Sequence, residues 1–336
     1  MKKLLTIGVP SYNAEKTLDE CLTSFIIPEI MDYYEVIIIN DGSKDRTSEI
    51  AEKYTQLYPK TFKLINKENG GHGSGINTTI KYASGQYIKI VDSDDTVLKD
   101  GMIELMRALE ETNADILFSP YIRTNVDTNY VERISYEETT KMVDYNKDLP
   151  LYNGKNFSIA MAGITYKASL LKENDYKIDE KCFYVDVEYT IYYCMSAKVI
   201  HCLKKELYNY HVGQAEQSVN IKNMINRRDQ HLYVCKQLIS FFEKQKNNMN
   251  EINRKIIKNN IIHMALINEV EILSKIDNKK TSLSEMKSFV TYVQKNSDDI
   301  YNELFSFKCG KKCGAIKLLS RLKFFPYSLF YYAVNR

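Results

Sequence analysis

Three carboxylates crowd the end of an apolar run in the first third of the chain. The apolar run covers residues 87–91, and Asp92, Asp94 and Asp95 follow it with Ser93 between them. Carboxylates at the end of a buried strand repel one another, and a divalent cation removes that repulsion while keeping positions open for substrate phosphates. The cluster therefore indicates a metal-dependent enzyme that acts on a phosphorylated donor. A polar turn in which Asp94 or Asp95 caps the next helix is the alternative.

Apolar β-rich runs alternate with helical patterns over the first 120 residues. Strands are expected at 4–9, 35–39, 62–65, 87–91 and 114–119, and helices at 15–27, 47–57, 76–83 and 101–110. This alternation produces βαβ units and a parallel sheet, which binds ligands at the carboxyl ends of its strands. We therefore expect the polar loops at 10–13, 40–45 and 92–95 to converge on one crevice.

The alternation weakens after residue 120. Residues 120–160 are polar and irregular, and edge strands are expected there. Further on, the expected elements are helices at 168–172 and 187–196, strands at 199–202 and 207–211, a helical stretch at 221–273 and a linker at 277–282.

Three motifs together resemble the family 2 glycosyltransferases, which have a GT-A fold. The motifs are Pro10-Ser11-Tyr12-Asn13, Asn40-Asp41-Gly42-Ser43-Lys44-Asp45 and Asp92-Ser93-Asp94-Asp95. The resemblance implies an α/β catalytic domain at 1–220, with a Rossmann-like, mostly parallel twisted sheet flanked by helices. Its nucleotide-binding half would be 1–120 and its acceptor half 121–220. Residues 221–336 are expected to form a helical C-terminal region.

The first two motifs carry side chains that suit a nucleoside. Tyr12 can offer a stacking face, and Asp41 can accept a hydrogen bond from an imide N–H such as that of uracil. The resemblance assigns both to the nucleoside pocket, with Pro10 shaping the strand exit. A partly buried tyrosine and an ordinary Asp-Gly turn are the alternatives.

Residues 69–77 resemble the Gly-rich segment that lies against the donor in this family. Gly71 and His72 are expected to contact the donor there. Family members often have an arginine where this chain has Ile76, so a pyrophosphate contact would be missing. His72, Ser74 or backbone N–H groups are expected to replace it. A solvated loop position is the alternative for His72.

In the family, the DxD motif holds Mn²⁺ or Mg²⁺ on the donor diphosphate. By this match Asp94 is the expected metal ligand. Asp92 and Ser93 are expected on the donor side, with Asp92 near the ribose or a metal-bound water. Asp95 is expected to cap the next helix or to orient the acceptor site. His211 is a candidate third metal ligand or phosphate contact, and a strand-end histidine is the alternative.

An inverting transfer also needs a general base for the acceptor hydroxyl. The family usually places an acidic pair ahead of a helix about ninety residues after the DxD motif. Val185 replaces the first acid here, and Asp186 keeps the second position and is the expected base. Glu188 is the fallback, and an N-cap role is the alternative for Asp186.

The segment 208–219 resembles the loop that closes over the diphosphate in this family. Gln217 and Ser218 match its Gln-Ser and are expected to bind phosphate oxygens. Gln214 stands where family members often carry a basic residue.

Charge is unevenly distributed along the 336 residues. Residues 221–336 carry 21 Lys and Arg against 10 Asp and Glu, whereas residues 1–220 have a net charge of −8. After Glu303 basic residues alternate with aromatic and aliphatic ones, a composition that suits an anionic membrane surface. Packing of this tail on the domain and a homo-oligomer interface are the alternatives. No RNA-binding motif is present, so nucleic acid is not expected as a partner.

The cysteines and remaining histidines carry no evident motif. Seven cysteines show no disulfide spacing, and no Cys/His set completes a zinc site with Cys309 and Cys313. His201, His231 and His263 lie on apolar or helical stretches and are expected to be structural. With no secretory signal or long apolar span, a cytoplasmic protein is expected.

These observations predict a metal-dependent, inverting glycosyltransferase. The expected donor is a nucleotide-sugar, a UDP-hexose or UDP-N-acetylhexosamine, and the expected acceptor is a hydroxyl of a cell-surface glycan or a lipid-linked glycan. A donor-binding module that has lost catalysis is one alternative. A sugar nucleotidyltransferase is another, although residues 10–13 lack the glycine-rich, basic signature expected after its first strand.

Overall fold

The computed structural model describes residues 3–135, 143–144, 160–174, 176–213, 217–249 and 251–335. The described residues form two compact units. The first covers the described residues up to Gly213, and the second begins at Gln217. The expected domain boundary at residue 220 and the division of the catalytic domain into halves remain predictions.

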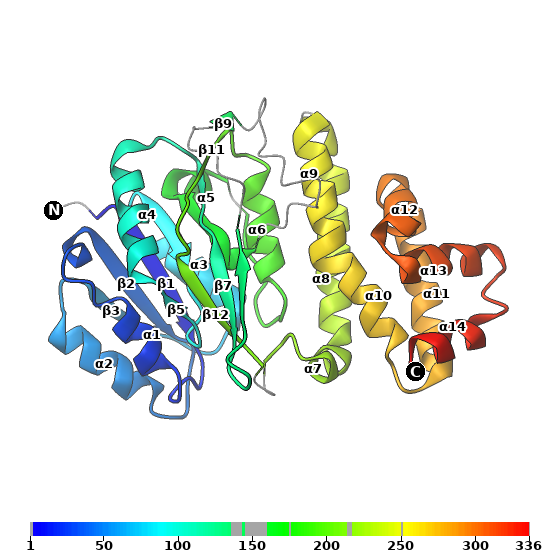
Figure 1. Ribbon diagram of the computed structural model, residues 1–336, viewed down its shortest axis with the longest axis horizontal. Coiled ribbons are helices and arrows are strands. Elements are labelled where there is room, and N and C mark those ends of the chain that lie inside the picture. Colours follow the sequence, from blue (N-terminus) through cyan, green and yellow to red (C-terminus); the bar gives the residue numbers. More distant parts are fainter. Residues whose placement is uncertain are drawn as a thin grey trace. The chain divides into compact units, whose positions relative to one another are not determined.

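The first unit contains strands with helices between them (Figure 1). Its strands are β1 (Leu5–Ser11), β2 (Tyr34–Asn40), β3 (Phe62–Asn66), β4 (Tyr87–Ile90), β5 (Thr96–Val97), β6 (Ile116–Phe118), β7 (Tyr121–Asn125), β8 (Val131–Ile134), β9 (Val143–Asp144), β10 (Ile164–Lys167), β11 (Val199–Cys202) and β12 (Tyr208–Val212). Its α-helices are α1 (Leu18–Ser24), α2 (Thr47–Leu57), α3 (His72–Tyr82), α4 (Lys99–Glu111), α5 (Ala168–Glu173) and α6 (Asp186–Cys194).

The larger sheet of this unit is mostly parallel. Its strand order in the described chain is β3-β2-β1-β4-β10-β6-β11-β9. β1 runs parallel to β2 and β4, β2 to β3, and β6 to β11, whereas β10 runs antiparallel between β4 and β6. A smaller sheet has the order β5-β12-β7-β8. The predicted α/β class with a mostly parallel sheet is confirmed.

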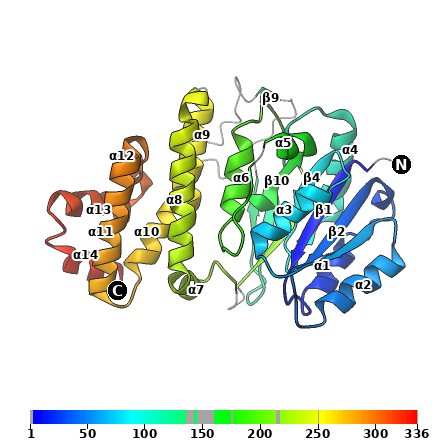
Figure 2. The ribbon, with the colours of Figure 1, turned by 180° about the vertical axis from the view of Figure 1, so that it is seen from behind.

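Side-chain alternation along β1 assigns its two faces to different helices. Leu5, Ile7 and Val9 belong to the same hydrophobic core as Met102 and Leu105 of α4. Successive residues of a strand point to opposite faces, so the intervening residues of β1 face the other layer. Figures 1 and 2 show α4 over one face of the sheet and α3 over the other.

Gly8 allows α3 to lie directly on β1. A Cβ added at Gly8 would lie 2.2 Å from Oγ1 of Thr79, and one added at Gly75 would lie 2.7 Å from Cβ of Pro10. Two glycines, one on each element, therefore let the helix approach the strand closely. This approach holds the first turn of α3 beside the carboxyl end of β1.

The second unit is helical. Its α-helices are α7 (Ile221–Asn226), α8 (Arg228–Gln245), α9 (Glu251–Ile261), α10 (Ile267–Ser274), α11 (Lys279–Asn296), α12 (Asp298–Leu304), α13 (Lys311–Arg321) and α14 (Tyr327–Val334). A π-helical segment, Ile262–Leu266, joins α9 to α10. None of the helices that the structure describes is long and apolar enough to cross a bilayer.

The prediction of a linker at 277–282 is wrong, because most of this segment is helical. The side chain of Asn278 accepts hydrogen bonds from the N–H groups of Lys280 and Thr281, both at 3.0 Å, and α11 begins at Lys279. The polar run is therefore the capped start of a helix, because an N-cap side chain satisfies N–H groups that the first turn leaves free.

Candidate active site

The loops after β1 and β2 are tied together by hydrogen bonds. The N–H of Asn13 donates to Oγ of Ser43 at 3.0 Å, and the N–H of Lys44 donates to Oδ1 of Asn13 at 2.9 Å. Tyr12 is 53% exposed, so a face of its ring is available for stacking. The structure thus brings two of the three predicted motifs together at the carboxyl edge of the sheet.

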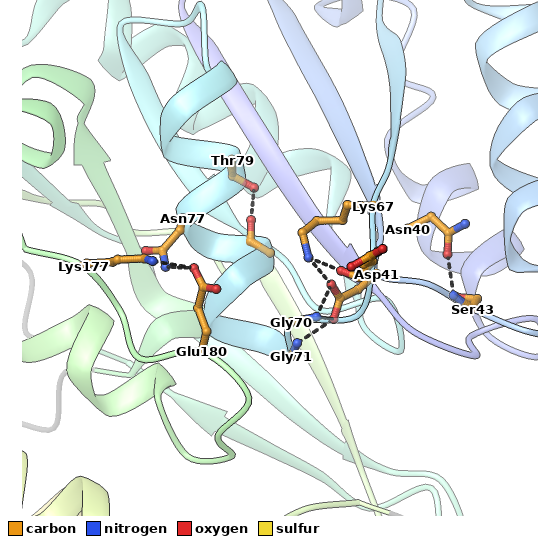
Figure 3. Close-up of polar contacts among 12 residues, drawn as sticks. Asn40, Asp41, Ser43, Lys67, Gly70, Gly71, Asn77, Thr79, Lys177 and Glu180 are labelled. Carbon is orange, nitrogen blue, oxygen red and sulfur yellow. Dashed lines mark hydrogen bonds and ion pairs between the residues drawn. The ribbon is translucent and has the colours of Figure 1, made fainter.

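Asp41 holds the backbone of the Gly-rich segment (Figure 3). Its Oδ1 accepts from the N–H of Gly70 at 2.9 Å and from Nζ of Lys67 at 2.6 Å, and its Oδ2 accepts from the N–H of Gly71 at 2.7 Å. The N–H of Gly70 also lies 3.2 Å from Oδ2, so both carboxylate oxygens of Asp41 already have two donors each, and its contact with a base remains a prediction. Lys67 brings a cation to this position, and no motif in the sequence signals it.

The Gly-rich segment is shorter than the sequence suggests. The sequence predicts a helix only from Ile76, but α3 begins at His72. Gly71 precedes it with φ of 80°, in the left-handed region that favours glycine. His72 is therefore in the first turn of a helix, where backbone N–H groups lack helical partners and suit an anion. Ile76 is fully buried in the core.

His72 contacts the acidic cluster. Its Nε2 lies 2.9 Å from Oδ1 of Asp92. Burial lowers the pKa of His72, but the charge and hydrogen bond of Asp92, together with the charges of Asp186 and Asp94, outweigh burial and raise the pKa above 6.5. The site therefore favours an imidazolium cation next to the carboxylates.

The three acidic residues of the DxD run lie together, with one carboxylate oxygen from each within 4.8 Å of the others. Asp92 and Asp94 are half-buried, whereas Asp95 is buried. Burial raises the pKa of Asp95 well above its usual range, and the neighbouring charges of Asp94 and Asp92 raise it further. An all-oxygen set with two accessible carboxylates fits a hard divalent cation.

Asp95 does not cap a helix. The helix that follows, α4, begins at Lys99 and has Leu98 at its N-cap. The carboxylate of Asp95 instead accepts from the hydroxyl of Tyr208 at 2.5 Å and from the N–H of His211 at 2.8 Å. The expectation of a cap is therefore wrong, and Asp95 joins the acidic loop to β12.

Both ring nitrogens of His211 have partners. Nδ1 donates to the carbonyl of Asp94 at 2.9 Å, which leaves Nε2 to accept from the side-chain amide of Asn209 at 3.0 Å. The partners assign this tautomer. A cation bound at Nε2 would have to displace Asn209, so a metal-ligand role for His211 remains a prediction that requires a rearrangement.

Asp186 is the first residue of α6, after Val185 at the N-cap. Burial raises the pKa of Asp186, His72 lowers it and Asp92 raises it again. Burial also raises the pKa of Tyr210, and the charges of all four site aspartates raise it further, Asp92, Asp95, Asp186 and Asp94 in that order.

Glu188 is fully buried two residues further along α6. Its Oε2 accepts from the N–H of Asp179 at 3.0 Å, and burial raises its pKa to about 8. A buried carboxyl committed to a neighbouring loop is poorly placed to reach an acceptor hydroxyl. The assignment of the base to Asp186 remains a prediction.

Asn77 links α3 to the loop that precedes α6 (Figure 3). Its Oδ1 accepts from the N–H of Ile178 at 3.1 Å, and its Nδ2 donates to the carbonyl of Ile178 at 2.8 Å and to Oε1 of Glu180 at 3.2 Å. The N–H of Lys181 donates to the carbonyl of Gly70 at 2.6 Å. The Gly-rich segment is thus held from both sides, a role for Asn77 that the motif alone does not indicate.

Gln217 and Ser218 belong to the second unit, and Gln214 lies outside the described residues. Their expected contacts with phosphate oxygens remain predictions. Ser93 is half-buried within the acidic run.

A mostly parallel α/β sheet with the loops after β1 and β2 and an acidic cluster at its edge is an arrangement typical of transferases. The chain matches the model of "Glycosyl transferase family 2" over residues 6–173. It belongs to this family, so the family expected from the three motifs is confirmed.

Curated relatives agree with this assignment. Glycosyltransferase GlyA of Streptococcus pneumoniae is 29% identical over 64% of this chain and 31% of its own length. Poly(ribitol-phosphate) beta-N-acetylglucosaminyltransferase TarS of Staphylococcus aureus is 28% identical over 61% of this chain and 35% of its own length. The matched regions span about a third of each relative.

Solved structures show the same fold. The crystal structure of S. aureus TarS 1–349 matches 96% of this chain and 92% of that chain, with a TM-score of 0.69 and 20% identity. A mannosyltransferase from Pyrobaculum calidifontis in complex with GDP-Man and Mn²⁺ matches with a TM-score of 0.52 and 13% identity. The expected GT-A fold is thereby confirmed.

Proposed function

We propose that the protein is a metal-dependent, inverting glycosyltransferase that moves a hexose or N-acetylhexosamine from a UDP-linked donor to a hydroxyl of a cell-surface glycan or a lipid-linked glycan. The observation that carries this proposal is the grouping of Asp92, Asp94 and Asp95 beside His72. The choice of UDP is supported by TarS, which has been crystallised with UDP and with UDP-GlcNAc.

Mn²⁺ or Mg²⁺ fits the acidic run, because its ligands would be carboxylate oxygens and two of the three carboxylates are accessible. Asp94 would hold the ion, and Asp92 would bind it through water or contact the ribose. When bound, the ion supplies Lewis-acid stabilisation of the departing diphosphate.

The side chains of this unit would perform the remaining steps. Tyr12 stacks on the base, and Asp41 accepts its imide N–H. His72 places a positive charge near the diphosphate. Asp186 takes the proton of the acceptor hydroxyl as its oxygen attacks the anomeric carbon, and the bond from that carbon to the diphosphate breaks. The raised pKa of Asp186 makes it a stronger base than an ordinary aspartate.

The test is release of UDP from a panel of UDP-sugars, with and without acceptor, in Mn²⁺ or in EDTA. We expect acceptor-dependent release that requires the cation and that Asp94→Asn abolishes. UDP binding without turnover of any donor would identify a donor-binding module instead. Incorporation of pyrophosphate into a nucleotide would identify a nucleotidyltransferase.

An anionic membrane surface is the second partner that we propose, which would place the protein at the inner face of the membrane. We call the surface concerned the tail surface. It consists of exposed apolar side chains of α13, of α14 and of the segment that joins them: Leu318, Leu322, Phe325, Leu329 and Tyr332. Phe325 is 93% exposed and Leu329 is 75% exposed. Lys317, Arg321 and Lys323 supply positive charge along the same segment, which complements anionic headgroups.

The opposite face of α14 is packed on the second unit. Tyr327 and Tyr331 are buried, and the hydroxyl of Tyr331 donates to the carbonyl of Ile276 at 3.0 Å. Packing therefore accounts for one face of this helix and leaves the other available to lipid. A membrane-bound chain would meet a lipid-linked acceptor at the same surface.

A further inference from the structure

Three side chains with metal-binding atoms meet inside the second unit, apart from the acidic run. His231 and Cys235 lie one turn apart on α8, and Glu269 comes from α10. One ligand atom from each lies within 4.8 Å of the other two, and all three residues are buried. The sequence predicts only a structural role for His231, because local spacing does not reveal a glutamate on another helix.

We call these three residues the His-Cys-Glu cluster. The distances between their ligand atoms resemble those of a metal site. Sγ of Cys235 lies 3.6 Å from Nδ1 of His231. Zinc bonds to sulfur and imidazole nitrogen at a tetrahedral angle would separate these two atoms by about 3.6 Å. Nδ1 of His231 lies 2.7 Å from Oε2 of Glu269, so that carboxylate oxygen would need to withdraw by about 0.7 Å to become a ligand.

Hydrogen bonds among the three residues do not satisfy the cluster. One ring nitrogen faces both Cys235 and Glu269, and it can donate to the carboxylate or accept from the thiol, but not both. Oε1 of Glu269 is buried and has no hydrogen-bond partner in the part of the chain that the structure describes. A buried acceptor without a partner is costly, and a cation would remove that cost.

We propose that the His-Cys-Glu cluster binds a zinc-type divalent cation that joins α8 to α10. The ligands are Nδ1 of His231, Sγ of Cys235 and the carboxylate of Glu269, whose unpartnered Oε1 supplies a fourth donor atom. A mixed nitrogen, sulfur and oxygen set selects this class of ion over Mg²⁺ or Ca²⁺, which prefer all-oxygen sites. The role is structural and lies beyond the proposed transfer reaction.

Binding would release protons. The thiol of Cys235 gives up its proton to become a thiolate ligand, and Nδ1 of His231 binds without one. Metal content should therefore fall as the pH is lowered.

The experiment measures metal content of the full chain after growth with added Zn²⁺ and extensive dialysis. We expect about one zinc per chain, and its loss in Cys235→Ser and in Glu269→Gln. Cys313→Ser is the matched control, because Cys313 is a buried cysteine of the same unit outside the cluster. Asp94→Asn should also keep the zinc, which separates this site from the acidic run.

A second measurement does not depend on the folding of a variant. Wild-type protein stripped with a chelator and loaded with Co²⁺ should show thiolate-to-cobalt charge-transfer absorption and a higher Tm than the stripped protein. Absence of that absorption, together with a Tm that neither chelator nor Zn²⁺ changes, would overturn the proposal. Equal zinc content in wild type and Cys235→Ser would do so as well.

Discussion

The hydroxyl of Tyr208 donates a hydrogen bond to Oδ2 of Asp95 at 2.5 Å and accepts one from the N–H of Asp92 at 3.1 Å. One side chain of β12 therefore fixes both ends of the acidic run. Since Asp95 is also held by the N–H of His211, its carboxylate is occupied before any ligand arrives. Asp92 and Asp94 differ from Asp95 in being only half-buried.

We predict that Tyr208→Phe destabilises the protein by about 1–3 kcal/mol, because the buried carboxylate of Asp95 loses its hydroxyl donor. Urea unfolding measures the loss. Tyr130→Phe is the matched control, because Tyr130 is exposed in the same unit and its change should stay within about 0.5 kcal/mol. Equal effects of the two substitutions would contradict a special role for Tyr208.

Asp186→Asn should abolish sugar transfer while UDP affinity stays near that of the wild type, because the substitution removes the base without changing the nucleoside pocket. Removing a general base typically slows a reaction about 10²- to 10⁴-fold. Turnover measured by UDP release and binding measured by calorimetry separate the two effects.

Glu188→Gln is the comparison for Asp186→Asn. It should retain transfer, because Glu188 is buried and bound to the loop at Asp179. If transfer survives in Asp186→Asn but disappears in Glu188→Gln, Glu188 and not Asp186 is the base.

Lys89 should make stability depend on pH. Its Nζ is buried and donates to the carbonyls of Ala162 at 2.7 Å and Ile164 at 3.2 Å, and burial lowers its pKa from 10.5 to about 7. The unfolded chain therefore binds more protons than the folded protein between pH 7 and 10.5. The contribution of Lys89 to the free energy of unfolding rises with pH across this interval and is constant below it.

Urea unfolding of wild type and Lys89→Met at several pH values from 6 to 9 tests this contribution. The difference in unfolding free energy between the two proteins should change above about pH 7. Lys60→Met, at an exposed position, should follow the wild type at every pH. A constant difference between Lys89→Met and wild type would show that Lys89 keeps its proton.

The tail surface predicts selective binding to anionic vesicles. The double variant Phe325→Ser with Leu329→Ser should bind phosphatidylglycerol vesicles at least about tenfold more weakly, because each large apolar side chain contributes up to about 1.5–3 kcal/mol on burial. Sedimentation with vesicles measures the binding, which should weaken with added salt and be absent with phosphatidylcholine. Tyr233→Ser, a change at an exposed aromatic of α8, is the control. Equal binding by the two variants would assign the tail surface another partner.

The strands could be predicted because a strand buried on both faces consists almost entirely of apolar residues. Every residue of β2 is buried, and the run at 35–39 is correspondingly apolar. The start of α3 could not be predicted in this way, because glycine disfavours helix. The first turn of α3 packs against a segment that is distant in the sequence: a Cβ added at Gly73 would lie 2.0 Å from the carbonyl oxygen of Asp179.

The site could be predicted as a set of residues but not as a network. Asp92 and Asp94 follow from a motif whose spacing is local. The partners of Asp95 lie more than a hundred residues further along the chain, on β12, and a local pattern assigned it to a cap instead. Lys67 belongs to no motif, and only the fold brings its amine to Asp41.

Asp41 has a consequence for the speed of donor capture. Its carboxylate already fixes the backbone of Gly70 and Gly71. The conformational entropy of that segment is therefore lost when the chain folds and not when a ligand binds. A donor nucleotide bound in the proposed way would meet this segment in its final form. Association should then proceed in a single kinetic phase whose rate is set by diffusion and charge, without a slow isomerisation of the segment.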